Sequence, residues 1–169
     1  MTRLLLALAV GVAALTGCGG GDDGGSNGNG GPSREEFVAD ANAICRDGEQ
    51  KIQEISRDGQ REIRQAPSDE QARRAVGDLL ERTTEEYRPY LDRLRELQPP
   101  DDLAEDWSNF LARVTEAFEL IPDLADATQE NDEEQLSELT AKFSEIAQDT
   151  RPFAERTGLD DCLPDEGTQ

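Results

Sequence analysis

Cysteines and carboxylates are the residue types of this chain that could carry chemistry. The chain has Cys18, Cys45 and Cys162 and 38 acidic residues, but no histidine. Without an imidazole, Ser-His-Asp and Cys-His catalysis, histidine-ligated haem and the usual zinc sites are excluded. A nucleophilic thiol also needs a nearby base such as histidine. We therefore expect no catalytic residue, no cofactor and no metal centre, and we predict that the protein is not an enzyme.

The clustered carboxylates have a simpler explanation than catalysis. Acidic groups at 101–102, 132–134 and 160–161 lie at the ends of expected helices. Capping and the helix dipole favour acidic side chains at helix N-termini, which accounts for the first two groups. The third group and the pair at 165–166 could hold calcium, but their spacing matches no EF-hand loop. A carboxylate pair could also hydrolyse a glycoside, but we expect Trp107 to lie in the core rather than in a sugar site.

An apolar N-terminal run ends in the most specific motif of the chain. Arg3 precedes an almost wholly apolar stretch at 4–15, which is shorter than the roughly 20 residues that cross a bilayer and is typical of a secretory signal. The run ends in Leu15, Thr16, Gly17 and Cys18, which resembles the lipobox of bacterial lipoprotein precursors. The resemblance implies cleavage before Cys18 and a diacylglyceryl thioether on its sulfur. An ordinary signal peptide with an incidental cysteine is the alternative.

The residues after Cys18 have the composition of a tether. Residues 19–32 are nearly all Gly, Asp, Asn and Ser, a composition typical of a flexible linker. The expected parts are a signal peptide (1–17), the lipidated cysteine with its tether (18–32), a helical domain (33–163) and a disordered tail (164–169). Because two or more acyl chains anchor a protein stably, we expect the domain on the extracytoplasmic face of the cell membrane.

The net charge of −21 limits the partners of the chain. Nucleic acids are excluded, because binding their phosphates needs clustered lysines and arginines. Anionic lipid headgroups would repel the domain, so we expect contact with the membrane only through the lipid on Cys18. Strong negative charge also keeps a protein soluble, which is the simplest explanation of it.

Hydrophobic periodicity predicts helices, because apolar residues recur at spacings of three and four and nowhere alternate. The first helix begins with a capping box formed by Ser33 and Glu36. Its apolar stripe is Phe37, Ala41, Ile44, Gly48, Ile52, Ile55, Gly59 and Ile63. The second helix is capped by Ser68 and ends at Pro99. Its stripe is Ala72, Val76, Leu79, Leu80, Thr83, Tyr87, Tyr90, Leu91, Leu94 and Leu97.

Two further helices complete the domain. We expect Asp101 or Asp102 to cap the third. Its stripe is Leu103, Trp107, Phe110, Leu111, Val114, Phe118, Ile121 and Leu124. We expect the fourth to open at Asn131, with a stripe of Leu136, Leu139, Phe143, Ile146, Thr150 and Phe153. Gly158, followed by an apolar residue, predicts a Schellman-type end.

Four helices joined by short turns predict an all-α, antiparallel up-down-up-down four-helix bundle. Pro89 and Pro122 lie inside predicted helices and should kink them, because proline removes a backbone donor. Together with Pro152 they could splay the bundle and open a pocket between helices. The alternative is that these prolines only bend the helices around a filled core.

Cys45 and Cys162 remain once Cys18 carries the lipid. Cysteines of exported proteins meet an oxidising environment and usually pair. In an up-down-up-down bundle the start of the first helix and the end of the fourth lie at the same pole, which brings these two residues together. We therefore predict a disulfide, to which the chain-entropy model assigns at most ~4–5 kcal/mol. Two free thiols for catalysis or metal binding are the alternative.

A set of apolar, proline and cysteine positions spread over residues 34–162 carries a family resemblance. These positions are Phe37, Ala41, Asn42, Ala43, Ile44 and Cys45, then Leu94, Leu97, Pro99 and Pro100, then Gly158, Leu159 and Cys162. The pattern resembles small exported helical lipoproteins of actinobacteria, a family without an established activity. The resemblance implies a helical domain stapled by a disulfide, and no functional residues beyond the two cysteines.

These observations favour a non-enzymatic interaction or binding module, with an envelope protein as its expected partner. A lipoprotein that binds a solute or cation for a transporter is the alternative. A carboxylate-based envelope hydrolase is the third interpretation. A filled bundle interior would leave only the surface for function, whereas a hollow one would favour the binding of a solute.

Overall fold

The computed structural model describes residues 31–163 of the chain. They form α1 (Arg34–Gln65), α2 (Asp69–Glu96), α3 (Ala104–Glu130), α4 (Glu133–Thr157) and a short 3-10 helix, η1 (Asp160–Cys162). No strand occurs in this range, so the predicted all-α fold with four helices is confirmed.

Several predicted segments lie outside the described residues. They are the signal peptide at 1–17, the lipobox with Cys18, most of the tether and the tail at 164–169. Among the helices between residues 31 and 163, none is long and apolar enough to span a membrane.

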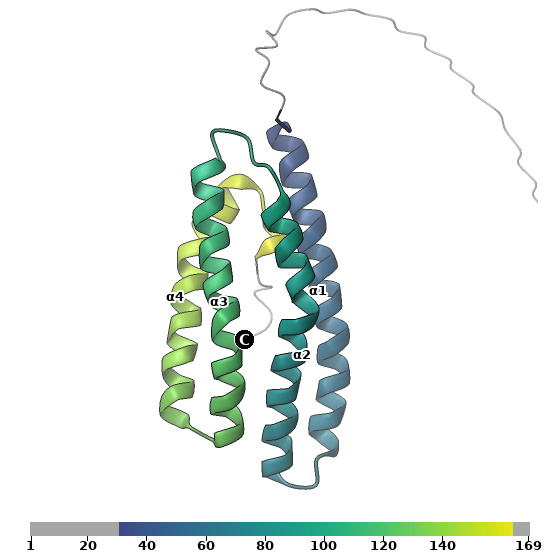
Figure 1. Ribbon diagram of the computed structural model, residues 1–169. Coiled ribbons are helices and arrows are strands. Elements are labelled where there is room, and N and C mark those ends of the chain that lie inside the picture. The colour runs from purple at the N-terminus through teal and green to yellow at the C-terminus, as the bar shows by residue number, and fades with distance from the viewer. Residues whose placement is uncertain (1–30, 164–169) are drawn as a thin grey trace, which may run out of the picture.

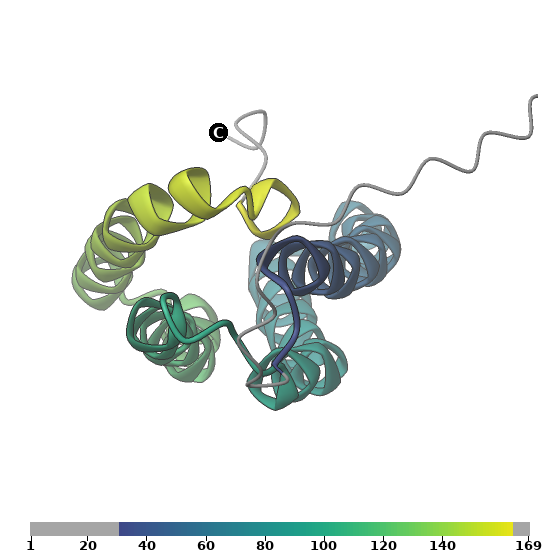
Figure 2. The same ribbon diagram turned by 90° about the horizontal axis from the view of Figure 1, so that it is seen from above.

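The helices pack in chain order, α1 on α2, α2 on α3 and α3 on α4, and consecutive helices run in opposite directions (Figure 1). Viewed from above, they form an incomplete ring (Figure 2). The helices α1 and α4 hardly touch, and η1 packs on α1 to close the ring. The end of the bundle that holds the start of α1 is called the upper half here, and the opposite end the lower half. Closure between the first and last helices therefore depends on η1.

Capping side chains start α1 and α2 as predicted. In the capping box of α1, the Glu36 backbone N–H donates to the Ser33 hydroxyl at 3.2 Å, and the Ser33 backbone N–H donates to the Glu36 carboxylate at 2.9 Å. The Ser68 hydroxyl accepts from the Gln71 backbone N–H at 3.3 Å. These bonds satisfy donors that a helix start leaves free. The backbone bond and then the hydroxyl bond of Ser33 lower the pKa of the Glu36 carboxyl.

The predicted cap of α3 by Asp101 or Asp102 was wrong. The cap position is Leu103, without a capping hydrogen bond from its side chain, and Leu103 is buried in the core. Asp102 instead lies 3.3 Å from Arg34, at the start of α1. Burying a leucine stabilises by about 1.5–3 kcal/mol, against about 1 kcal/mol for a cap, so packing decides where α3 begins.

The predicted opening of α4 at Asn131 was also wrong, because Asp132 is the capping residue. Asn131 ends α3 in the left-handed conformation, with φ 58°. Asparagine tolerates this conformation better than most residues. The predicted end of α4 is confirmed, since Gly158 has φ 85° and the Leu159 N–H donates to the Ala154 carbonyl at 2.9 Å. Both ends of α4 are thus set by short-range hydrogen bonds.

Three prolines lie inside helices that continue through them: Pro89 in α2, Pro122 in α3 and Pro152 in α4. The kinks expected at these positions stay a prediction. The helices are therefore tolerant of a missing backbone donor at each of these sites.

The tightly packed core lies in the upper half. Phe37 meets Trp107 edge-on with 5.0 Å between ring centroids, and Trp107 stacks on Phe110 at 5.4 Å. The predicted place of Trp107 in the core is confirmed. Many large apolar residues of the lower half are only half-buried, namely Ile55, Ile63, Val76, Leu79, Leu80, Ile121, Leu124, Leu136 and Phe143. Packing is therefore unequal along the bundle.

Two helical glycines should respond in opposite ways to alanine. A Cβ on Gly77 would meet only the flexible side chain of Gln129, whereas a Cβ on Gly48 would lie 2.6 Å from the Tyr87 ring. Replacing glycine within a helix stabilises by roughly 0.5–1 kcal/mol where space allows. We expect Gly77→Ala to raise the free energy of unfolding and Gly48→Ala to lower it, as measured in urea. An equal gain from both would show that the Tyr87 ring moves freely.

Candidate functional site

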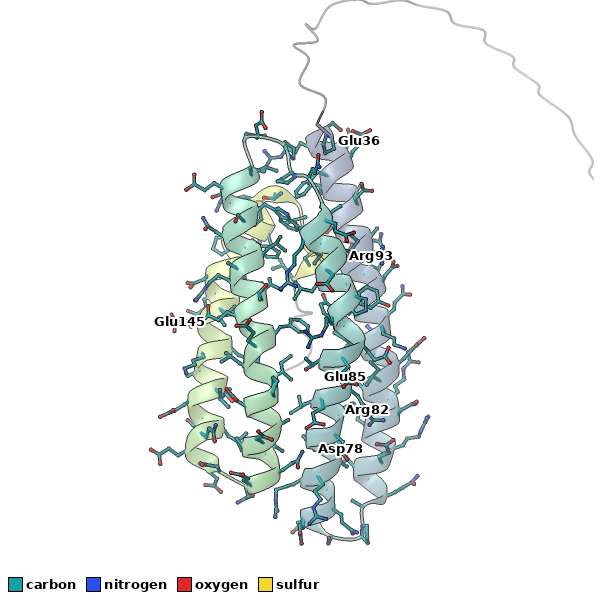
Figure 3. The ribbon with its side chains drawn as sticks, in the orientation of Figure 1. Glu36, Asp78, Arg82, Glu85, Arg93 and Glu145 are labelled. Carbon is teal, nitrogen blue, oxygen red and sulfur yellow. A yellow bond between two sulfur atoms is a disulfide. The ribbon has the colours of Figure 1, made fainter. Side chains whose placement is uncertain are left out.

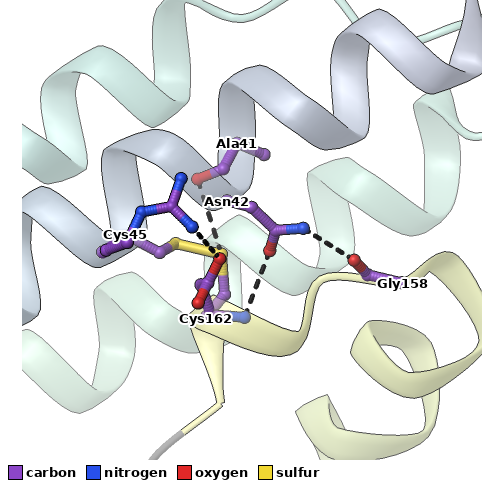
Figure 4. The surroundings of a disulfide bond; sticks show 7 residues. Ala41, Asn42, Cys45, Gly158 and Cys162 are labelled. Atoms are coloured by element: carbon purple, nitrogen blue, oxygen red, sulfur yellow. Dashed lines mark hydrogen bonds and ion pairs between the residues drawn. A yellow bond between two sulfur atoms is a disulfide. The ribbon is translucent and has the colours of Figure 1, made fainter. Parts of the chain in front are cut away.

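Cys45 of α1 and Cys162 of η1 form the predicted disulfide, with their Cα atoms 5.0 Å apart (Figure 4). Asn42 bridges the same elements one turn earlier. Its amide donates to the Gly158 carbonyl at 2.8 Å, and its side-chain oxygen accepts from the Asp161 N–H at 3.2 Å. A covalent bond and two hydrogen bonds therefore join the start of α1 to the end of the helical domain, where direct packing of α1 on α4 is sparse.

A cleft of about 640 Å³ lies beside the disulfide. One wall is α1 from Cys45 to Gln60, the upper end is 161–163, and the floor is Tyr87 of α2 with Phe118 of α3. This volume is within the range of about 300–1,000 Å³ found for small-molecule sites. None of the described lining residues belongs to α4. The cleft thus occupies the side on which α1 lacks a neighbouring helix.

Two stacked aromatic rings form the floor of the cleft. Tyr87 and Phe118 have ring centroids 4.9 Å apart and planes inclined by 18°. Gly48 allows the Tyr87 ring to lie against α1. Burial, and then the charge of Glu49, raises the pKa of the Tyr87 hydroxyl. This hydroxyl has no hydrogen-bond partner among residues 31–163, so it can bond to a bound molecule.

An alkaline titration should reveal the buried tyrosine. Tyr87 is the only tyrosine left in the Tyr90→Phe variant, and we expect its phenolate absorbance to appear above the ordinary pKa of about 10. Because its folded-state pKa is raised, its contribution to stability is present below the unfolded pKa and is lost as pH rises through the folded value. The same variant in urea provides the unfolded reference. Identical titration curves in both states would contradict the burial of Tyr87.

Polar side chains of α1 line the other end of the cleft. Ser56, Arg57 and Gln60 lie three to four turns beyond Cys45. The Arg57 Nε donates to the Gln53 carbonyl at 3.1 Å. Its terminal nitrogens form no ion pair with any residue from 31 to 163, and Arg57 is the only basic residue among the described cleft-lining residues. The cleft is therefore apolar near the disulfide and rich in donors at its far end.

The outer surface of the bundle is charged, with side chains such as Glu36 and Glu145 pointing away from the helices (Figure 3). Oppositely charged residues pair between α1 and α2, as in Lys51–Glu86 at 3.2 Å. From residue 114 to residue 141, in contrast, every charged side chain is acidic. The lower part of α3 and the start of α4 are thus the most acidic segment of the domain.

Of the residues predicted to carry chemistry, the structure brings together Cys45 and Cys162. Leu15, Thr16, Gly17 and Cys18 lie outside the described residues. Between residues 31 and 163, no group of three or more His, Cys, Asp or Glu is placed to hold a metal ion. The cysteine pair is therefore the part of the predicted site that the structure confirms.

Sequence reasoning missed the cleft itself. Tyr87 and Phe118 were expected on apolar stripes that face the core, and both do face inward, but there they form the floor of an open space. The glycine at Gly48 on the stripe of α1 was the available signal, because it indicated close approach by a neighbouring group. Comparison with protein-family models, curated proteins and solved structures gave no match.

Proposed function

We propose that this chain is a non-enzymatic binding module, anchored to the extracytoplasmic face of the cell membrane, and that the cleft is its binding site. The cleft is the observation that carries the proposal. A concave apolar surface with a few polar groups is the general form of a small-molecule site. Of the interpretations that the sequence left open, it favours binding of a solute within the bundle over a purely structural interior.

The fluorescence of the neutral apolar dye Nile red tests the cleft directly. We expect a saturable rise in fluorescence with the folded protein. Ser56→Trp places a large ring in the cleft and should weaken binding at least tenfold. Gln50→Trp adds the same ring at an exposed position of α1 outside the cleft, and should leave binding unchanged. The absence of saturable binding, or an equal loss in both variants, would contradict the proposal.

The membrane anchor rests on Cys18. Each buried methylene of an acyl chain contributes about 0.8 kcal/mol, so two or three chains hold a protein stably at a bilayer. The tether at 19–32 would then let the domain reorient above the surface. In a bacterial host, the unaltered protein should fractionate with membranes, and Cys18→Ala should not, whereas the tether variant Ser26→Ala should behave like the unaltered protein. Membrane retention of Cys18→Ala would contradict a lipid anchor.

An envelope protein with a basic surface is the second candidate partner. The uniformly acidic segment at 114–141 favours it, because opposite charge accelerates association. Capture of such a partner from envelope extracts should weaken as salt rises, since screening shortens the range of exposed charges. Capture that is insensitive to salt would contradict recognition by charge.

A further inference from the structure

We infer that the cleft takes a single-chain anionic amphiphile, with its alkyl chain lying towards the disulfide and its anionic head beside Arg57. This inference rests on the proposed binding role of the cleft and adds the chemical class of the ligand. Three features of the cleft carry it: its shape, the change of polarity along α1, and the state of its charged residues.

The cleft is long and narrow. The segment of α1 from Cys45 to Gln60 spans about 22 Å, at 1.5 Å per residue. Spread over that length, the volume of about 640 Å³ corresponds to a mean cross-section of roughly 30 Å². Such a shape suits one extended chain better than a fused ring system or a pair of chains.

Polarity changes in one direction along the cleft. The end beside the disulfide is lined by Ile52, Tyr87, Phe118 and Leu163, and is closed by η1. The far end presents the Ser56 hydroxyl, the Arg57 guanidinium and the Gln60 amide. Alkyl groups are stabilised by leaving water for the first environment. An anion is stabilised by the second, where a guanidinium donates charge-assisted hydrogen bonds.

The charges of the cleft favour an anionic head over a cationic one. Asp161 is already paired with Arg46 at 2.7 Å. Glu49, one turn from Cys45, accepts from the Gln53 amide at 2.9 Å. Arg57 has no such partner among residues 31–163. The net charge of −21 repels anions at long range, but at physiological salt charges are largely screened beyond about 8 Å.

Calorimetric titration with dodecanoate, dodecyl phosphate and dodecylamine, below their micellar concentrations and in physiological salt, tests the inference. Both anions should bind at least fivefold more tightly than the amine. Arg57→Gln should weaken anion binding about threefold to fivefold, the range of an exposed charge contact. Arg64→Gln is the matched control, because Arg64 is exposed near the end of α1 and does not line the cleft. Octanoate should bind much more weakly than dodecanoate, since each buried methylene adds affinity.

The outcomes separate the inference from the proposed function. Saturable Nile red binding together with equal or tighter binding of dodecylamine would overturn the anionic head, and the cleft would remain a binding site. Equal affinities for octanoate and dodecanoate would overturn the placement of the chain. The absence of any binding, of dye or amphiphile, by protein with an unchanged helical circular dichroism spectrum would overturn the proposed function itself. Loss of anion preference in Arg57→Gln, but not in Arg64→Gln, supports the inference.

Discussion

Replacing Cys45 and Cys162 together with alanine is expected to lower the free energy of unfolding by about 3–5 kcal/mol and Tm by about 10 °C or more. The two cysteines are 117 residues apart, so the bond restricts nearly the whole unfolded domain. It also joins α1 to η1 on the side where α1 and α4 hardly touch. Urea denaturation followed by circular dichroism gives the loss in free energy.

Two controls isolate the contribution of the disulfide. Arg46→Ala removes the exposed Arg46–Asp161 ion pair at the same junction, and should cost less than about 1 kcal/mol. A reducing agent should destabilise the unaltered protein as much as the double substitution does, and should not affect the double variant. A loss no larger than that of Arg46→Ala would show that packing, rather than the disulfide, closes the ring.

Phe37→Ala is expected to cost about 3–5 kcal/mol, whereas Phe143→Ala should cost no more than about half as much. Phe37 is 1% exposed and contacts Trp107 in the upper core. Phe143 lies on α4 in the lower half and is only half-buried. The same truncation therefore leaves a closed cavity in the first case and an open, hydrated space in the second.

The pair of phenylalanines measures how unequal the packing of the bundle is. Denaturant midpoints of the two variants give the difference, provided that the slope of free energy against denaturant is unchanged. Equal losses would mean that the lower half is packed as tightly as the upper half. In that case the cleft would be too poorly supported to hold a defined shape.

Local features of the fold could be predicted from the sequence because their causes are local. The capping box of Ser33 with Glu36, the cap at Ser68 and the glycine end at Gly158 each depend on hydrogen bonds within a few residues. The disulfide was predictable for a different reason. Chain direction alone brings the start of the first helix and the end of the fourth to one pole, so the pairing of Cys45 with Cys162 follows from the order of the helices.

Features set by distant contacts could not be predicted in this way. The start of α3 depends on burial of Leu103 against residues from other helices, which outweighs the capping preference of its acidic neighbours. Periodicity also assigned Tyr87 and Phe118 correctly to inward faces. It gave no information on the distance between helices, and that distance decides whether an inward residue lies in a core or lines a cleft.

The proposed anchor and the cleft are compatible in one molecule. Acyl chains on Cys18 would keep the domain within reach of the membrane, and a narrow apolar cleft ending in Arg57 would hold a chain that has left a bilayer or is about to enter one. The acidic surface would limit adhesion to anionic headgroups, so exchange of the bound chain would not require the whole domain to lie on the membrane.

The most direct test of the cleft as a binding site is methyl NMR of isoleucine-labelled protein during titration with dodecanoate. Ile52 lines the cleft, whereas Ile44, two turns earlier on α1, is buried in the upper core. We predict saturable shifts of the Ile52 methyl signals and little change at Ile44. No shift at saturating dodecanoate, or shifts spread evenly over both residues, would contradict a binding site in the cleft.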